Sequence, residues 1–244
     1  MRYAVMQPTF LPWAGYFRLA AFVDYFVFLD DVQLSRQSWQ TRNRILVDGE
    51  VHWLSVPIGH DRLDQRINET KIADSAGRWR RKVARLLQQS YARARFKSDL
   101  ADLIVALETA PQETLADFNI ALAAKIMSLF GIQASILRSS GMGLTQAERT
   151  DRLIEIGTKL CCDTYISPIG SRGYLETDAF ASRTTMRLTY LAQDPPAYDQ
   201  GSTKGFVPRL SIVDGVANLG WRGAGNYVRG EWIAANLPGI EILC

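Results

Sequence analysis

The chain has 244 residues, of which 47% are hydrophobic, and its formal net charge is +3. This composition is ordinary for a globular protein with a sizeable core, and the small net charge does not by itself indicate a nucleic-acid-binding protein. Three cysteines and two histidines form neither a disulfide framework nor a zinc-binding pattern. No apolar run reaches the roughly 18 residues of a membrane helix, and the opening residues lack a signal-peptide pattern. We therefore expect one cytoplasmic domain, residues 1–244, without a membrane partner.

The beginning of the chain predicts a β-α-β unit. An apolar run at residues 3–6 enters a turn rich in proline and aromatic residues, a helix is expected over residues 13–22, and a second apolar run covers residues 25–29. Ligands of open α/β sheets bind outside the carboxyl ends of the strands. The polar residues expected at these strand ends are Gln7, Asp30, Asp31 and Gln33.

The middle of the chain predicts a hairpin followed by helices. Asp48-Gly49 stands between two β-rich runs, residues 44–47 and 51–56, and is a strong hairpin signal. A short strand is expected near residues 67–72. Helices are expected at residues 76–94, 98–108 and 115–130, and Gly131 is suited to cap the last of them.

An α/β pattern returns after residue 131. Thr145-Gln-Ala-Glu148 fits a capping box that opens a helix. The strands and the later helix are expected at residues 134–137, 164–167, 186–191 and 209–219. The predicted fold class is therefore α/β, with a Rossmann-like parallel-sheet core into which residues 44–131 are inserted as a hairpin and helices.

Three groups of motifs carry a resemblance to a known family. QPTFLPWAGYF, FVFLDDVQ and W-Q-x-R-N-R open the chain, YISPIGSRGYL lies in its middle, and YDQ, FVPRLSIVD and NLG lie near its end. In this order they resemble the WbqC-like family of bacterial proteins over residues 1–220. Members are associated with surface-polysaccharide and other sugar-biosynthesis loci, so the resemblance implies a small, sugar-linked substrate.

Asp30 and Asp31 are the candidate catalytic residues. Adjacent carboxylates can hold Mg²⁺, bind an amine or act as a general base. The alternative is that they are solvated at a strand end or cap the next turn, because adjacent strand residues point to opposite faces. Their place at a strand's carboxyl end and in the family motif favours function. The cofactor is left open, with ATP and Mg²⁺ as candidates, and no residue is assigned as a dedicated metal ligand.

A second set of residues is expected to bind substrate. Arginine forks recognise carboxylate or phosphate groups in a bidentate manner, although an arginine at a strand start can also form a structural salt bridge. Two polar residues of LSIVD lie one helical turn apart, with helix capping as the alternative for the serine. The expected substrate-binding residues are Gln7, Trp39, Arg42, Asn43, Ser211 and Asp214.

A third set is expected to bind a nucleotide. The opening unit is similar to nucleotidylyltransferases and pantothenate synthetases, in which a His-x-Gly-His turn after the first strand holds ATP phosphates. Here Trp13 and Tyr16 stand in place of the histidines, and packing in the core is the alternative for both. A glycine-rich loop follows a later strand and can present backbone N–H groups to phosphate. The expected nucleotide-binding residues are Trp13, Gly15, Tyr16, Gly170, Ser171 and Tyr174.

Residues 78–97 carry eight basic side chains and no acidic one. Such a helix can meet RNA, an acyl carrier protein or an acidic substrate, but a solvated face is the more common outcome and is expected here.

These observations favour a biosynthetic enzyme that modifies a sugar or amino-sugar type of small molecule, by ATP-dependent amide ligation. An ATP-independent acyl- or glycosyltransferase, and a non-catalytic protein that binds a nucleotide-sugar or a partner enzyme, remain as alternatives. Nucleic acid and carrier proteins are not favoured as partners.

Overall fold

The computed structural model describes residues 1–35, 37–59, 62, 64–74, 77–110, 113–145, 147–191, 196–201 and 205–230. The strands of the main sheet are β1 (Arg2–Met6), β2 (Tyr25–Phe28), β5 (Ser135–Arg138), β6 (Thr164–Pro168) and β7 (Arg187–Leu191), and the hairpin consists of β3 (Arg42–Val47) and β4 (Glu50–Ser55). The helices are α1 (Ala14–Ala21), α2 (Arg78–Ser90), α3 (Lys97–Thr109), α4 (Leu115–Leu129), α5 (Arg149–Lys159), α6 (Arg172–Thr177), α7 (Phe180–Arg183) and α8 (Ile212–Arg229).

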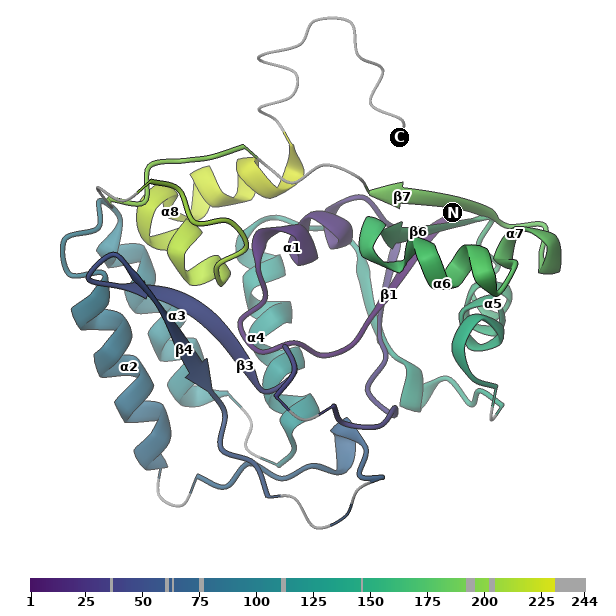
Figure 1. The fold of residues 1–244 in the computed structure, drawn as a ribbon, viewed down its shortest axis with the longest axis horizontal. Coiled ribbons are helices and arrows are strands. Elements are labelled where there is room, and N and C mark those ends of the chain that lie inside the picture. Colours follow the sequence, from purple (N-terminus) through teal and green to yellow (C-terminus); the bar gives the residue numbers. More distant parts are fainter. Residues whose placement is uncertain are drawn as a thin grey trace, which may run out of the picture.

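Five parallel strands form the main sheet in the order β5-β2-β1-β6-β7 (Figure 1). The chain moves outward from β1 through β2 to β5, and then returns to the other side of β1 with β6. This order corresponds to the first five strands of dinucleotide-binding folds, and the direction reverses between β1 and β6. The predicted α/β fold with a parallel core is confirmed.

Helices cover both faces of the sheet, as a buried parallel sheet requires. Alternate residues of a strand point to opposite faces, so Tyr3 and Val5 of β1 pack in a core cluster with residues of α5, α6 and α7. Ala4 of β1 and Phe26 of β2 point the other way and join the larger cluster, which contains residues of α1, α4 and α8. Two apolar layers therefore enclose the sheet.

The chain between β2 and β5 forms a separate antiparallel hairpin and helices α2 to α4. In Figure 1 the hairpin lies toward the viewer, whereas α3 and α4 are drawn fainter and lie behind it. Asp48 and Gly49 have φ values of 52° and 77°, the left-handed conformations that a two-residue hairpin turn needs. The hairpin predicted from Asp-Gly is thus confirmed.

Two local predictions are wrong. The strand expected near residues 67–72 is a 3₁₀ helix at Ile67–Glu69, because the carboxylate of Glu69 accepts a hydrogen bond from the backbone N–H of Arg66 and closes a turn. The capping box is also absent: α5 begins only at Arg149, and its N-cap makes no side-chain hydrogen bond. Thr145 instead donates its hydroxyl to Glu155 on the second turn of the helix.

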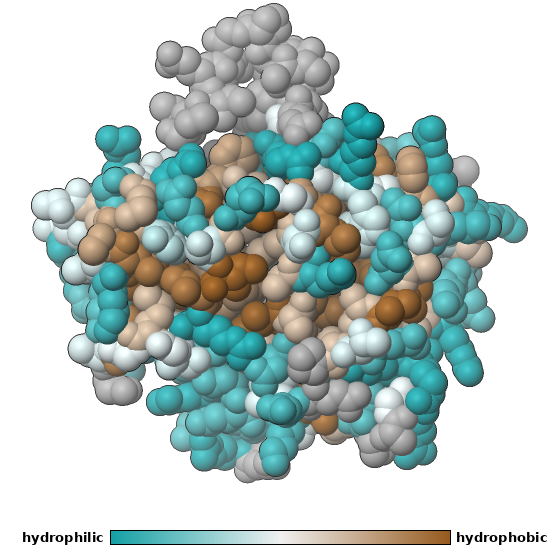
Figure 2. All heavy atoms as spheres, turned by 180° about the vertical axis from the view of Figure 1, so that it is seen from behind, coloured by the Kyte–Doolittle hydropathy of each residue, from teal (hydrophilic) through white to brown (hydrophobic). Residues whose placement is uncertain are grey.

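The far side of the molecule carries apolar surface. Figure 2 shows a band of hydrophobic residues across the middle of this face, with hydrophilic residues above and below it. Within the described parts of the chain, none of the helices combines the length and the apolar content needed to cross a bilayer.

Candidate functional site

The turns that follow the parallel strands meet at the carboxyl edge of the sheet, because parallel strands end at the same edge. Gln7 follows β1, and Asp30 and Asp31 follow β2. The 3₁₀ turns Ser139–Gly141 and Ile169–Ser171 follow β5 and β6. The structure therefore places three of the predicted segments and the turn after β5 along one edge, and the strand order reverses between Gln7 and the turn after β6.

Asp30 joins the ends of β2 and β5. Its carboxylate is almost completely buried and accepts hydrogen bonds from the Ser139 hydroxyl at 3.2 Å, the Ser140 N–H at 3.0 Å and the Ser140 hydroxyl at 2.7 Å. Buried carboxylates need such partners. Asp30 therefore has an evident structural role, and a catalytic contact from it would require some of these bonds to break.

Asp31 points to the other face of the sheet, toward α5. It forms an ion pair with Arg152, and its other oxygen accepts the Ser139 hydroxyl at 2.5 Å. The two charged side chains are 16% and 12% exposed, so both are mostly buried yet reach the surface. The Nε of Arg152 has no hydrogen-bond partner within the described residues. This pair can present a carboxylate and a guanidinium donor together at the carboxyl edge.

The sequence predictions did not include the serines or Arg152. Ser139 and Ser140 lie just beyond the strand predicted at residues 134–137. The rule that ligands bind at the carboxyl ends of parallel strands, which pointed to Asp30, could therefore have pointed to them as well. Arg152 lies 121 residues from Asp31, and nothing in the linear pattern connects the two.

Gln7 lies at the surface and is held by a buried polar network. Its Oε1 accepts a hydrogen bond from Gln40 Nε2 at 2.7 Å, and the Oε1 of Gln40 accepts from the Ser35 N–H at 2.9 Å. Asn119 of α4 donates to the carbonyls of Pro8 at 3.2 Å and Gln40 at 2.9 Å. The network fixes the turn after β1 to the chain that enters the hairpin.

Asn43 and Ser211 hold the turn before α1. The amide nitrogen of Asn43 donates to the carbonyls of Phe10 at 3.0 Å and Leu11 at 2.8 Å, and its oxygen accepts the N–H of Arg44. The hydroxyl of Ser211 donates to the carbonyl of Leu11 at 2.8 Å. Both side chains are buried, and both are hydrogen-bonded to the backbone. The substrate contacts expected of them would therefore require the turn before α1 to change conformation.

Asp214 is buried at the start of α8, in a cluster of hydrogen-bond donors. It accepts from the Tyr198 hydroxyl at 2.7 Å, from Gln200 Nε2 at 3.0 Å and from the Tyr91 hydroxyl at 3.2 Å. Burial raises the pKa of the Asp214 carboxyl, and these hydrogen bonds oppose the increase. The YDQ and LSIVD motifs therefore meet in a buried cluster that anchors α8.

The turn at the start of α1 is tightly packed. Tyr16 is buried against Phe26, with ring centroids 5.3 Å apart, and its hydroxyl donates to the carbonyl of Gln7 at 3.0 Å. Burial raises the pKa of Tyr16 well above its usual value. A Cβ on Gly15 would lie 2.0 Å from the ring of Trp13, so this indole lies over the first turn. Nucleotide contacts from Gly15 or Tyr16 require these groups to move.

The turn after β6 is more open. Gly170 is exposed, and a Cβ built on it meets no atom within 4 Å. Ser171 is partly exposed, and Tyr174 is an exposed aromatic residue whose pKa is raised by partial burial of the hydroxyl. Among the residues predicted to bind a nucleotide, Gly170, Ser171 and Tyr174 are therefore accessible to a ligand at the carboxyl edge of the sheet.

Trp39 and Arg42 lie on the hairpin side of the carboxyl edge. Trp39 is an exposed ring next to Gln40, which contacts Gln7. Arg42 lies over the ring of Trp53, 4.4 Å from its centroid. These two predicted residues therefore adjoin the edge, but they belong to an aromatic cluster on the hairpin.

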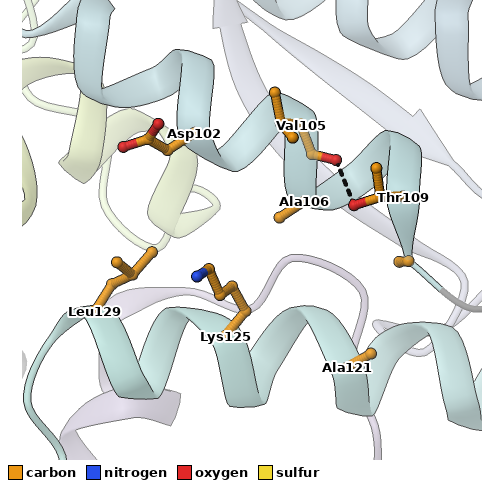
Figure 3. Close-up of a pocket in the computed structure, with 8 residues that line it drawn as sticks. Asp102, Val105, Ala106, Thr109, Ala121, Lys125 and Leu129 are labelled. Atoms are coloured by element: carbon orange, nitrogen blue, oxygen red, sulfur yellow. Dashed lines mark hydrogen bonds between the residues drawn. The ribbon is translucent and has the colours of Figure 1, made fainter.

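A hollow elsewhere in the structure lies between α3 and α4. It encloses about 580 Å³. Figure 3 shows Val105 and Thr109 on one helix facing Ala121, Lys125 and Leu129 on the other. None of the predicted site residues lines it. In the described parts of the chain, no cluster of three or more histidine, cysteine or acidic residues could hold a metal ion.

Comparisons with known proteins agree with the motif resemblance. The model of the WbqC-like protein family matches residues 7–225. The chain is 31% identical over 228 residues to the uncharacterized protein Rv1507c of Mycobacterium tuberculosis, and the match covers 93% of this chain and 96% of that protein. No solved structure matches the chain. Because the matches extend over most of its length, the chain belongs to the WbqC-like protein family.

Proposed function

We propose that this protein is a biosynthetic enzyme that binds a nucleotide-type ligand at the carboxyl edge of its sheet and forms an amide on a sugar or amino-sugar type of small molecule. The observation that carries the proposal is the reversal of strand order between β1 and β6. In open α/β sheets, ligands bind at this point. Exposed Gln7 lies on one side of it and exposed Gly170 on the other. The sugar class rests on the family's association with polysaccharide loci.

In this proposal Asp31 and Arg152 act together. The carboxylate of Asp31 accepts a proton from the attacking amine as its nitrogen bonds to the acyl carbon. The bond from that carbon to the phosphate oxygen of an acyl-adenylate breaks, and AMP leaves with the bonding electrons. Arg152, whose side chain is held beside Asp31 and is 12% exposed, stabilises the negative charge that develops on the oxygens.

Asp30 supports this arrangement indirectly. The Ser139 hydroxyl lies within hydrogen-bonding distance of both acidic side chains, at 3.2 Å from Asp30 and 2.5 Å from Asp31. Since Asp30 holds Ser139 and Ser140 in place, it is a positioning residue for Asp31. The turn after β6, with Gly170 and Ser171, supplies backbone groups for the phosphates.

One observation favours the transferase alternative, which uses no ATP. Trp13 lies over Gly15 in the first turn of α1, where related nucleotide-binding folds place phosphates. A donor that arrives already activated would need no phosphate site at this helix. For an acyltransferase the amide-forming step is of the same type as in a ligase, because an amine attacks an activated acyl group in each, whereas a glycosyltransferase would form a glycosidic bond instead.

Two measurements test the proposal. Thermal denaturation of the full chain with Mg-ATP, and separately with UDP-N-acetylglucosamine, should show stabilisation by at least one ligand. Asp31→Asn should remove that stabilisation, while Arg187→Gln, an exposed change at the amino end of β7, should retain it. Exchange of pyrophosphate into ATP in the presence of small amino acids then separates a ligase from a transferase. Stabilisation by neither ligand, or equal stabilisation of Asp31→Asn, would contradict the assignment.

A further inference from the structure

The outward face of the β3–β4 hairpin carries an aromatic and basic cluster. The strand register places Arg44 opposite Trp53, with Arg42 two residues before Arg44 on the same face of β3. Trp39 precedes β3 and packs against Trp53, with ring centroids 5.6 Å apart. We call Trp39, Arg42, Arg44 and Trp53 the hairpin platform.

The platform is a stack of flat groups that remains open to solvent. Arg42 lies over Trp53 at 4.4 Å, and Arg44 lies 5.6 Å from the centroid of Trp39 and 5.9 Å from that of Trp53. Trp39 is 46% exposed and Trp53 is 43% exposed. Tryptophan is normally much more buried than this, and contiguous exposed aromatic surface marks a binding site more often than a single exposed side chain does.

The platform carries two positive charges that lack an acidic partner in the part of the chain that the structure describes. Within the described residues, neither Arg42 nor Arg44 forms an ion pair, although Arg44 donates to the carbonyls of Pro208 and Arg209. An anionic partner therefore matches the charge of this surface. A second copy of the chain would bring arginines against arginines, which disfavours self-association through this face.

The basic helix α2 packs along the same hairpin. Trp79 Nε1 donates to the carbonyl of Ser55 at 2.7 Å near one end of α2, and the Tyr91 hydroxyl accepts the N–H of Leu46 at 3.4 Å just past the other. Its exposed side chains without an ion pair in the described chain include Arg81, Lys82 and Arg85. Exposed basic side chains therefore also occur on the helix that packs against this hairpin.

We propose that the hairpin platform binds single-stranded nucleic acid. Unpaired bases stack on the exposed indoles, and the phosphates contact Arg42 and Arg44. Exposed aromatic rings combined with a basic surface are the features by which proteins bind single strands with little sequence preference. A duplex offers its phosphates but hides the faces of its bases. A small ligand would require a concave pocket rather than the open face of a hairpin.

This inference goes beyond the proposed function and does not depend on it. The two sites are neighbours, because Gln40, the residue after Trp39, bonds to Gln7 at the carboxyl edge. A strand bound on the platform would therefore end close to the proposed active site.

Fluorescence anisotropy with a labelled single-stranded oligonucleotide of about 12 residues, within the site sizes of such proteins, tests the proposal. The full chain should bind it, and binding should weaken steeply between about 50 and 200 mM salt. Trp39→Ala and Trp53→Ala should each weaken binding by about tenfold or more. Trp39→Phe should restore most of the affinity, because phenylalanine retains an aromatic face.

Two variants serve as controls. Arg187→Gln removes one exposed charge at the opposite edge of the sheet, and Val105→Ala removes exposed apolar surface on α3. Both should bind the oligonucleotide like the unmodified chain. Absence of binding at low salt, equal binding of a duplex of the same length, or tryptophan variants that bind normally would each overturn the proposal. This experiment measures oligonucleotide binding. A negative result can therefore be distinguished from a negative result in the thermal-denaturation test of Asp31, which measures stabilisation of the protein by a small ligand.

Discussion

Asp31 and Arg152 form an ion pair across the carboxyl edge of the sheet, although 121 residues separate them in the chain. The pair connects the end of β2 to the first turns of α5, on the face of the sheet opposite α1. Both side chains are mostly buried, so solvent screens their interaction less than it screens a surface pair. The pair thus holds two charged side chains in a fixed arrangement at the proposed site.

We expect Asp31→Asn to abolish the proposed activity and to reduce the free energy of unfolding by about 1–3 kcal/mol, because it leaves the charge of Arg152 mostly buried and unpaired. Urea denaturation of Asp31→Asn, Arg152→Gln and the double variant measures the coupling between the two residues. The double variant should be destabilised by less than the sum of the single ones. Additive effects would show that the ion pair contributes nothing.

Asp30→Ala should destabilise the fold more than Asp31→Asn does. It removes the buried acceptor of hydrogen bonds from Ser139 and Ser140, and it leaves the Ser140 N–H without this partner, at a cost of about 2–4 kcal/mol. Denaturation midpoints measure this, with Asp102→Asn on the exposed face of α3 as a control that should change stability by less than about 0.5 kcal/mol. A fully stable Asp30→Ala variant that has lost activity would instead assign Asp30 a direct catalytic role.

Asp214 should make the stability of the protein depend on pH. Burial raises its folded-state pKa above the unfolded value of about 4, so the folded state binds the proton more tightly. The stabilisation that Asp214 contributes is then complete below about pH 4 and decreases as pH rises through the folded pKa.

Unfolding free energies of the unmodified chain and of Asp214→Asn, measured from acidic to neutral pH, isolate this effect. The destabilisation caused by the substitution should be largest at acidic pH and should shrink toward neutrality. A destabilisation that grows with pH would mean that the donors from Tyr91, Tyr198 and Gln200 outweigh burial.

Gly15→Ala tests the packing of the first turn of α1. The new Cβ would lie 2.0 Å from the ring of Trp13, and such overpacking costs about 1–3 kcal/mol. Gly173→Ala in α6 is the matched control, because a Cβ there meets no atom within 4 Å and alanine favours helix. Thermal denaturation should show a lower midpoint for the first variant and no decrease for the second. Equal midpoints would mean that Trp13 moves away freely and leaves the helix start open.

Much of the architecture could be predicted from local patterns. The apolar runs of β1, β2 and β6, the Asp-Gly turn and the helical periodicity of α2 to α4 each depend on neighbouring residues, so they are visible in the linear chain. The two wrong predictions also have local causes. The Glu69 carboxylate accepts the N–H of Arg66 where a strand was predicted, and the Glu155 carboxylate accepts the Thr145 hydroxyl where a capping box was predicted.

The position of the candidate site at the carboxyl edge also followed from the sequence, since the strand ends were recognisable and parallel strands share an edge. The role of each polar residue there did not follow. Asn43 and Asp214 occur in motifs typical of the family, yet the structure shows them buried and bonded to Leu11 and Tyr198. A motif shows which residues occur together, but not whether they face a ligand or a backbone group.

Only the tertiary structure decided which distant residues meet. Arg152 reaches Asp31 from a crossover helix, and Trp53 reaches Trp39 through the register of a hairpin. Secondary structure is governed by interactions between residues a few positions apart, which the order of amino acids displays directly. The chemistry of a site depends on burial and on partners that arrive from other elements, and these are set only when the sheet, its helices and the hairpin pack together.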